Sequence, residues 1–129
     1  ILTGTDGVNV LSGGANVDVL IGLGGNDTLE GGSGNDILDG GDGIDIATYV
    51  NAAAGVQVIL GQNGADGRVT AQFPVNDVDT LKSIEAVFGS NFADAMFGNE
   101  QNNIFRGFGI AVGAHVAYDI LVGVVLKPG

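Results

Sequence analysis

A unit of nine residues is repeated five times without a gap near the start of the chain. The frames are Gly4–Ser12, Gly13–Ile21, Gly22–Glu30, Gly31–Asp39 and Gly40–Thr48. Their sixth positions hold Asn9, Asp18, Asp27, Asp36 and Asp45, and their eighth positions hold Leu11, Leu20, Leu29, Leu38 and Ala47. Acidic, aliphatic and glycine positions locked in one phase exclude a random glycine-rich linker and predict a repeat structure.

The first six positions of each frame have the composition of a tight turn. Glycine reaches a positive φ without a Cβ clash, so it suits such a turn. The turn directs several backbone carbonyls to one side, and the sixth residue adds a charged oxygen. Calcium takes roughly six to eight oxygen ligands and tolerates irregular geometry, so these turns are suited to binding it.

Positions seven to nine have the composition of a short strand, such as Ile37–Asp39. The middle side chain of a strand faces away from its two neighbours, so the eighth-position residues are expected to point inward. The ninth-position residues should then point to water, as for Ser12, Glu30, Asp39 and Thr48. One repeat buries almost nothing by itself, and the repeats must therefore stack.

These residues resemble the hemolysin-type calcium-binding nonapeptide of RTX proteins, Gly-Gly-x-Gly-x-Asp-x-apolar-x. The fourth and fifth frames match best, although Ala47 stands where a larger aliphatic residue is usual. The first frame has Thr5 in place of the second glycine and Asn9 in place of the aspartate. Asn16 and Leu23 replace glycine in the next two frames.

The resemblance implies an all-β fold, a parallel β-roll that is a right-handed β-solenoid, with two nonapeptides in each coil. Alternate repeats then stack on one flank, and calcium bridges each repeat to the next but one. This stacking predicts the intervals 9/27, 27/45 and 18/36, hence about three calcium ions. The candidate side-chain ligands are Asn9, Asp18, Asp27, Asp36, Asp42, Asp45 and Asp94. The candidate turn glycines are Gly13, Gly14, Gly22, Gly24, Gly25, Gly31, Gly32, Gly34, Gly40, Gly41 and Gly43.

The strict period stops after Thr48, so residues 1–48 are predicted to form the calcium-loaded roll. Residues 49–78 contain two apolar runs, Val56–Leu60 and Arg68–Phe73, which predict a hairpin insertion. In the connector that follows, Leu81, Ile84 and Val87 recur every third residue. That spacing would suit a helix, but the glycine and β-branched residues favour further roll strands.

Weakened repeats return at residues 89–97 and 98–106, so residues 79–106 are expected to continue the roll. They keep inward residues at Met96 and Phe105 but lose turn glycines and charge. Two interpretations stay open: these coils bind no metal, or Asp94 and Asp79 complete one extra site. Residues 107–129 are expected to form an irregular C-terminal cap, because solenoids need their last coil covered.

The charge balance supports a link between metal binding and folding. The net charge is −11 with four Lys and Arg, and no basic residue precedes Arg68. Carboxylates without cationic partners repel each other, so the metal-free chain should be loose until calcium binds. Nucleic acid is an unlikely type of partner for so acidic a chain. The chain begins at Ile1 inside a repeat, which predicts a fragment or a processed module.

The expected function is a calcium-binding module of a secreted, extracellular bacterial protein, because RTX proteins generally leave the cell through a type I exporter. Such a module would fold on extracellular calcium and then stabilise or cap its parent protein. A catalytic role is not expected, because the chain has one His, no Cys and no Gly-x-Ser-x-Gly motif. The apolar stretch 109–126 contains His115, Asp119 and several glycines, which argues against a membrane span.

The alternative function is a polysaccharide-binding or adhesin module, with a cell-surface ligand as partner. A sugar-binding face needs exposed aromatic rings. The candidates are Tyr49, Phe73, Phe88, Phe92, Phe97, Phe108 and Tyr118. Several of them on one exposed face would favour this alternative, and burial would weaken it. The oligomeric state is not predicted.

Overall fold

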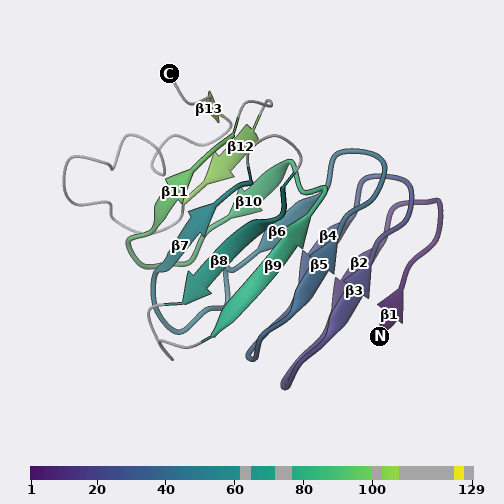
Figure 1. Ribbon diagram of the computed structural model, residues 1–129, viewed down its shortest axis with the longest axis horizontal. Coiled ribbons are helices and arrows are strands. Elements are labelled where there is room, and N and C mark those ends of the chain that lie inside the picture. Colours follow the sequence, from purple (N-terminus) through teal and green to yellow (C-terminus); the bar gives the residue numbers. More distant parts are fainter. Residues whose placement is uncertain (62–64, 72–76, 100–102, 108–123, 127–129) are drawn as a thin grey trace.

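The computed structural model describes residues 1–61, 65–71, 77–99, 103–107 and 124–126. Every regular element among these residues is a β-strand, and the strands form two sheets (Figure 1). This part of the chain accordingly has no helix long and apolar enough to cross a membrane.

The nonapeptides form short strands that alternate between the two sheets. These strands are β1 (Leu2–Thr3), β2 (Val10–Ser12), β3 (Val19–Ile21), β4 (Thr28–Glu30), β5 (Ile37–Asp39) and β6 (Ile46–Thr48). Each pairs in parallel with the next strand but one, so that Leu11 lies opposite Leu29 and Leu20 opposite Leu38. This is the two-repeat register that the resemblance to the RTX nonapeptide implied.

Seven strands follow the repeats: β7 (Val56–Ile59), β8 (Gly67–Ala71), β9 (Val78–Lys82), β10 (Ala86–Phe88), β11 (Ala95–Phe97), β12 (Asn103–Arg106) and β13 (Val124–Leu126). One sheet has the order β1-β3-β5-β9-β8-β7-β11 and the other β13-β12-β10-β6-β4-β2. The connector therefore contains strands β9 and β10, which pair in parallel with β5 and β6.

The hairpin of β7 and β8 does not stand outside the stack but enters one sheet. Strand β8 is antiparallel to both β7 and β9, and β7 pairs in parallel with β11 (Figure 1). In the other sheet β10 pairs directly with β12. The two sheets do not close into a regular coil, and the fold is all-strand with parallel pairing, consistent with a β-roll. A right-handed solenoid stays a prediction.

The C-terminal segment differs in part from the expected irregular cap. Strand β13 pairs antiparallel with β12, with Val125 opposite Ile104. A strand at a sheet edge pairs through backbone hydrogen bonds, which many sequences can form. No repeat in the sequence therefore predicted this short strand. The rest of the predicted cap lies outside the described residues, apart from Gly107.

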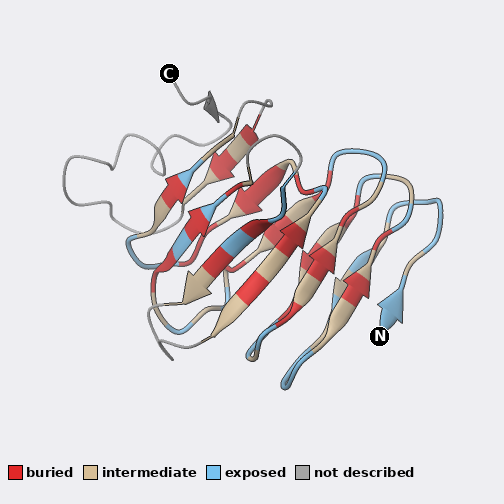
Figure 2. Cartoon of the chain, viewed as in Figure 1, coloured by how far each residue is buried: buried red, intermediate tan, exposed pale blue. Residues whose placement is uncertain are grey.

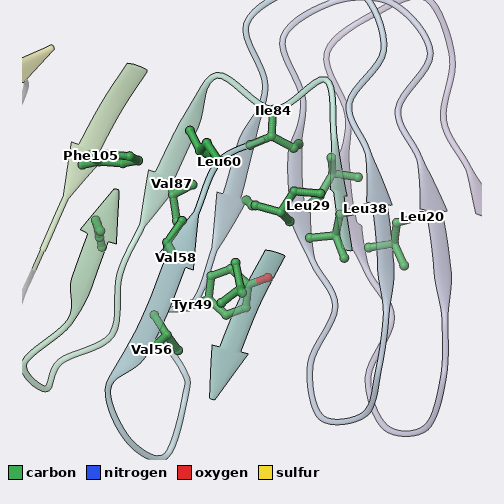
Figure 3. Packing of buried hydrophobic residues seen from close by; sticks show 14 residues of the cluster. Leu20, Leu29, Leu38, Tyr49, Val56, Val58, Leu60, Ile84, Val87 and Phe105 are labelled. Carbon is green, nitrogen blue, oxygen red and sulfur yellow. The ribbon is translucent and has the colours of Figure 1, made fainter. Parts of the chain in front are cut away.

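A row of apolar side chains forms the core between the sheets. Leu20, Leu29, Leu38 and Ala47 are fully buried, as expected for the eighth position. Figure 2 shows buried segments in the strands of both sheets, and Figure 3 shows Leu20, Leu29 and Leu38 in the core. The row continues beyond the repeats with Leu81, Val87, Met96 and Phe105, all buried. Burying one such side chain stabilises the fold by about 1.5–3 kcal/mol, so a continuous row favours stacking over isolated repeats.

Candidate metal-binding turns

The turns between the repeat strands share one backbone conformation. In the second to fifth frames the second and fourth positions have a positive φ, including the non-glycine residues Asn16 (75°) and Leu23 (77°). A Cβ on Gly34 would strike the carbonyl of Asn16 in the preceding turn of the same flank. Glycine at these positions thus lets successive turns approach closely. The first frame differs, because neither Thr5 nor Gly7 has a positive φ.

The sixth-position carboxylates stack into a ladder on each flank. In three of the four aspartates, one carboxylate oxygen accepts a hydrogen bond from the backbone N–H of the sixth-position residue one coil earlier. Asp27 accepts from Asn9, Asp45 accepts from Asp27, and Asp36 accepts from Asp18, each at 2.8 Å. The structure therefore brings together the three predicted pairs 9/27, 27/45 and 18/36.

Both ladders continue past the repeats through residues outside the nonapeptide pattern. Asp36 N–H donates to Asp79 Oδ1 at 2.8 Å, and Asp45 N–H donates to Glu85 Oε2 at 2.9 Å. The sequence indicated Asp79 as a candidate ligand of an extra site but did not indicate Glu85. Because of the inserted hairpin, Asp45 and its ladder partner Glu85 are 40 residues apart, instead of the 18 residues that separate partners within the repeats. Only the strand pairing, with Ala47 opposite Val87, reveals this correspondence.

The second oxygen of each repeat aspartate has no protein partner. Among the described residues, the Oδ2 atoms of Asp18, Asp27, Asp36 and Asp45 are buried and accept no hydrogen bond. A buried charged oxygen without a partner costs at least about 1–3 kcal/mol. Four such atoms at equivalent positions indicate that another group completes them.

The unpartnered oxygens face a space that a side chain would fill. A Cβ built on Gly13 would lie 2.7 Å from Asp18 Oδ2 and 2.8 Å from the carbonyl oxygen of Gly31. At Gly22 the corresponding atoms are Asp27 Oδ2 and the carbonyl oxygen of Gly40. The first-position glycine therefore leaves room between a carboxylate of one turn and a carbonyl of the next.

This donor set fits a hard divalent cation. Calcium prefers carboxylate and carbonyl oxygens and accepts irregular arrangements of them. The described part of the chain has no cluster of three or more Asp, Glu or His side chains that could hold a metal. A cation in these turns would therefore take most of its ligands from backbone carbonyls, which agrees with the glycine content of the turns.

Three of the other predicted ligands have different surroundings. Asn9 Oδ1 accepts from Thr5 N–H at 2.7 Å, so its amide is occupied within its own turn. Asp42 is exposed at a turn tip. Asp94 Oδ1 accepts from Val56 N–H at 2.9 Å and from Ser90 Oγ at 2.7 Å, beside β7. The hairpin separates Asp94 from the ladder of Asp18 and Asp36, so Asp94 and Asp79 do not share a site.

Burial makes several of these carboxylates hard to ionise without a cation. Burial, together with the negative charges of Asp18 and Asp77, raises the pKa of Asp36 to about 6, although the hydrogen bond from the Asp18 backbone lowers it. Burial also raises the pKa of Asp79 to about 7, and those of Asp45 and Glu85 above their ordinary values.

Tyr49 ends one ladder with a protein hydrogen bond. Its buried hydroxyl donates to Asp79 Oδ2 at 2.8 Å, while Asp79 Oδ1 accepts from Asp36. Both oxygens of Asp79 are thus occupied, unlike those of the repeat aspartates. From the sequence, Tyr49 was a candidate only for a sugar-binding ring. Its contact with Asp79, 30 residues further along the chain, follows no repeat pattern.

Comparison with known families agrees with the sequence pattern. Residues 1–29 and 12–47 match the model of the RTX calcium-binding nonapeptide repeat, in four copies. The match confirms the resemblance that the repeat frames indicated. No curated protein gives a significant match to the chain.

Proposed function

Because residues 1–47 carry RTX calcium-binding nonapeptide repeats, the chain contains a calcium-binding module, and we propose that calcium drives its folding. The observation that carries this proposal is the set of four buried Oδ2 atoms without partners, aimed between successive turns. Calcium bound there supplies the positive charge that the carboxylates lack. Asp18, Asp27, Asp36 and Asp45 hold it together with carbonyls of the turn glycines.

Metal binding and folding form one equilibrium in this proposal. The carboxylate of one turn and the carbonyl of the next come together only when the strands are stacked. A cation that binds the stacked form and not the unfolded chain stabilises the fold by mass action. Without it, the close approach of like charges opposes stacking.

The module is proposed to belong to a secreted bacterial protein and to act outside the cell. Calcium sites of extracellular modules typically have dissociation constants of about 10⁻⁴–10⁻³ M. Sites of that strength would be empty in the cytosol and filled outside, so the chain would pass a type I exporter unfolded. After export, the folded module would stabilise or cap its parent protein.

The direct test is far-UV circular dichroism of chelator-treated protein during titration with calcium, with magnesium as the control. We expect a cooperative rise of β signal near millimolar calcium and none with magnesium, because magnesium demands a stricter geometry. A chain that is already folded without calcium, and whose spectrum calcium leaves unchanged, would exclude calcium-driven folding.

A second candidate function is binding of a polysaccharide or cell-surface ligand. Phe97 on β11 is 40% exposed and lies opposite Ile59 on β7, which is 37% exposed. Phe92, in the turn before β11, is also exposed. Against this, Tyr49 is buried, and Phe88 lies 5.4 Å from the guanidinium of Arg106.

The remaining aromatic candidates, Phe73, Phe108 and Tyr118, lie outside the described residues. Affinity electrophoresis of calcium-loaded protein through gels containing bacterial polysaccharides tests this function. Retardation that is lost in Phe97→Ala and kept in Val10→Ala, a matched exposed apolar control on β2, would support it. Equal mobility of all three proteins in every gel would reject it.

A further inference from the structure

The turn between β9 and β10 stacks on the fifth nonapeptide turn, although it is not a nonapeptide. It consists of Ser83, Ile84 and Glu85 and contains no glycine or aspartate. Gly40 N–H donates to the carbonyl of Lys82 at 2.9 Å, and Asp45 N–H donates to Glu85 Oε2 at 2.9 Å. Glu85 therefore stands where a repeat has its sixth-position aspartate.

The same bonds connect one nonapeptide turn to the next. Gly22 N–H donates to the carbonyl of Asp39 at 2.8 Å, and Asp27 N–H donates to Asp45 Oδ1 at 2.8 Å. The carbonyls of Asp27 and Asp45 likewise accept from the first residues of β6 and β10. The short turn thus reproduces the inter-turn contacts of the repeats with three residues in place of six.

The oxygen-lined space is reproduced as well. A Cβ on Gly40 would lie 2.5 Å from Asp45 Oδ2, and it would also strike the carbonyl oxygen of Ser83. At Gly22 the same two roles belong to Asp27 Oδ2 and the Gly40 carbonyl. Asp45 is 0% exposed, and its Oδ2 accepts no hydrogen bond from the described residues.

We propose that the fifth nonapeptide turn and the turn Ser83–Glu85 hold a further divalent cation between them. Asp45 Oδ2 and the Ser83 carbonyl face the cation, and Glu85 supplies the second carboxylate. The proposal rests on the calcium function proposed above, but it adds a site that the nonapeptide pattern does not contain. Carboxylate and carbonyl oxygens again select a hard cation, calcium.

The turn Ser83–Glu85 borders a cavity, and the basic residue nearest to it in sequence already has an acidic partner. A cavity of about 380 Å³ is lined by Ser83, Ile84 and Glu85, among other residues. Lys82, the basic residue nearest in sequence, forms an ion pair with Asp66 at 3.0 Å. Lys82 and Asp66 line the same cavity, and the Lys82 ammonium is already paired with a carboxylate there.

The test counts bound calcium ions by native mass spectrometry and calorimetry in three proteins. Glu85→Gln keeps the side-chain length and an oxygen that can accept from Asp45 N–H but removes the charge. Glu30→Gln makes the same chemical change on the outward face of β4 and is the control. We expect Glu85→Gln to bind one ion fewer than the wild type and Glu30→Gln to bind the wild-type number.

The outcomes separate this inference from the proposed function. A wild-type ion count in Glu85→Gln overturns the inference and leaves the calcium function standing, whereas a wild-type chain that binds no calcium overturns both. If Glu85→Gln does not fold in calcium, Glu85→Asp decides, because it keeps the charge. Glu85→Asp also draws the carboxylate back by one methylene group, so a folded variant that binds one ion fewer, or binds one ion more weakly, supports the site, and a folded variant with the wild-type count and affinities contradicts it.

Discussion

At the scale of single residues, the repeat aspartates divide their two oxygens between two tasks. In Asp27, Asp36 and Asp45, Oδ1 accepts a backbone N–H from the neighbouring coil, and Oδ2 is the oxygen that we propose to bind a cation. Asparagine cannot perform both tasks, because it has one oxygen and carries no charge. Asn9 instead uses its oxygen within its own turn. The identity of the sixth residue therefore decides how strongly each interval attracts calcium.

Asp27→Ala is expected to weaken calcium binding more than Asn9→Ala. Asp27 belongs to the intervals 9/27 and 27/45 and has an unpartnered Oδ2, whereas Asn9 belongs to one interval and is neutral. Losing a charge-assisted contact of about 1.5–3 kcal/mol predicts a fall in affinity on the order of 10- to 100-fold for Asp27→Ala. Calorimetric calcium titration measures it, and equal losses for the two variants would reject the stacking register.

Leu23→Gly is expected to stabilise the calcium-loaded protein. Leu23 has a φ of 77°, in the left-handed region that costs a side-chain-bearing residue about 1–2 kcal/mol. Its side chain is 43% exposed, so little packing is lost. After the greater unfolded-state entropy of glycine is subtracted, the gain should be about 0.5–1 kcal/mol. Urea unfolding in saturating calcium measures it; Leu23→Ala keeps the strain and should show no gain.

At the scale of elements, the two flanks of turns end differently. On one flank the ladder of Asp18 and Asp36 ends at Asp79, whose oxygens are both satisfied by the protein. On the other flank the ladder of Asp27 and Asp45 ends at Glu85, next to an unpartnered Asp45 oxygen. The hydroxyl of Tyr49 therefore satisfies the last carboxylate of one ladder, whereas Asp36 Oδ2 and Asp45 Oδ2, one coil earlier on each flank, both lack a partner among the described residues.

Tyr49→Phe is expected to destabilise the calcium-loaded protein by about 1–3 kcal/mol, because it removes a buried hydrogen bond to a carboxylate. The ring and its packing are retained, so the change isolates the hydroxyl. Thermal or urea unfolding at saturating calcium measures the loss. Phe97→Tyr alters an exposed ring by the same hydroxyl group and should leave stability nearly unchanged. A Tyr49→Phe protein as stable as the wild type would show that Asp79, at the end of this ladder, does not need the hydrogen bond from the Tyr49 hydroxyl.

At the scale of the whole molecule, protons and calcium are expected to compete for the same buried carboxylates. In the folded state burial raises the pKa of Asp36 to about 6 and that of Asp79 to about 7, from 3.8. The protonated groups therefore favour the metal-free fold. This contribution is complete below about pH 4 and is lost as the pH rises through about 6–7.

Metal-free protein should accordingly have more β signal at about pH 5 than at about pH 8. With limiting calcium the order reverses, because calcium binds the ionised carboxylates and protons compete with it. Circular dichroism at both pH values, with chelator and with calcium, measures both effects. The contribution of Asp79 is checked with Asp79→Asn, which should reduce the pH dependence of the metal-free protein. Metal-free protein that gains β signal as the pH rises would contradict the raised pKa values of Asp36 and Asp79 in the folded state.

The sequence predicted most of what depends on neighbours within one repeat. The period of nine specified which residues enter the core, from Leu20 to Ala47, and the family resemblance added which sixth-position residues meet across coils. These predictions succeed because turn backbone, strand length and side-chain alternation are local properties. Even the weakened repeats kept Met96 and Phe105 in phase, and both are buried.

The tertiary structure decided what depends on residues far apart in the chain. The entry of β7 and β8 between β9 and β11 rests on backbone pairing at strand edges, which carries little sequence information. That insertion changes the spacing of the ladders, and so it selects Glu85 and Asp79 as their last members. The repeats by themselves thus determined which sixth-position residues stack on one another, whereas only the folded chain determined where the two ladders end.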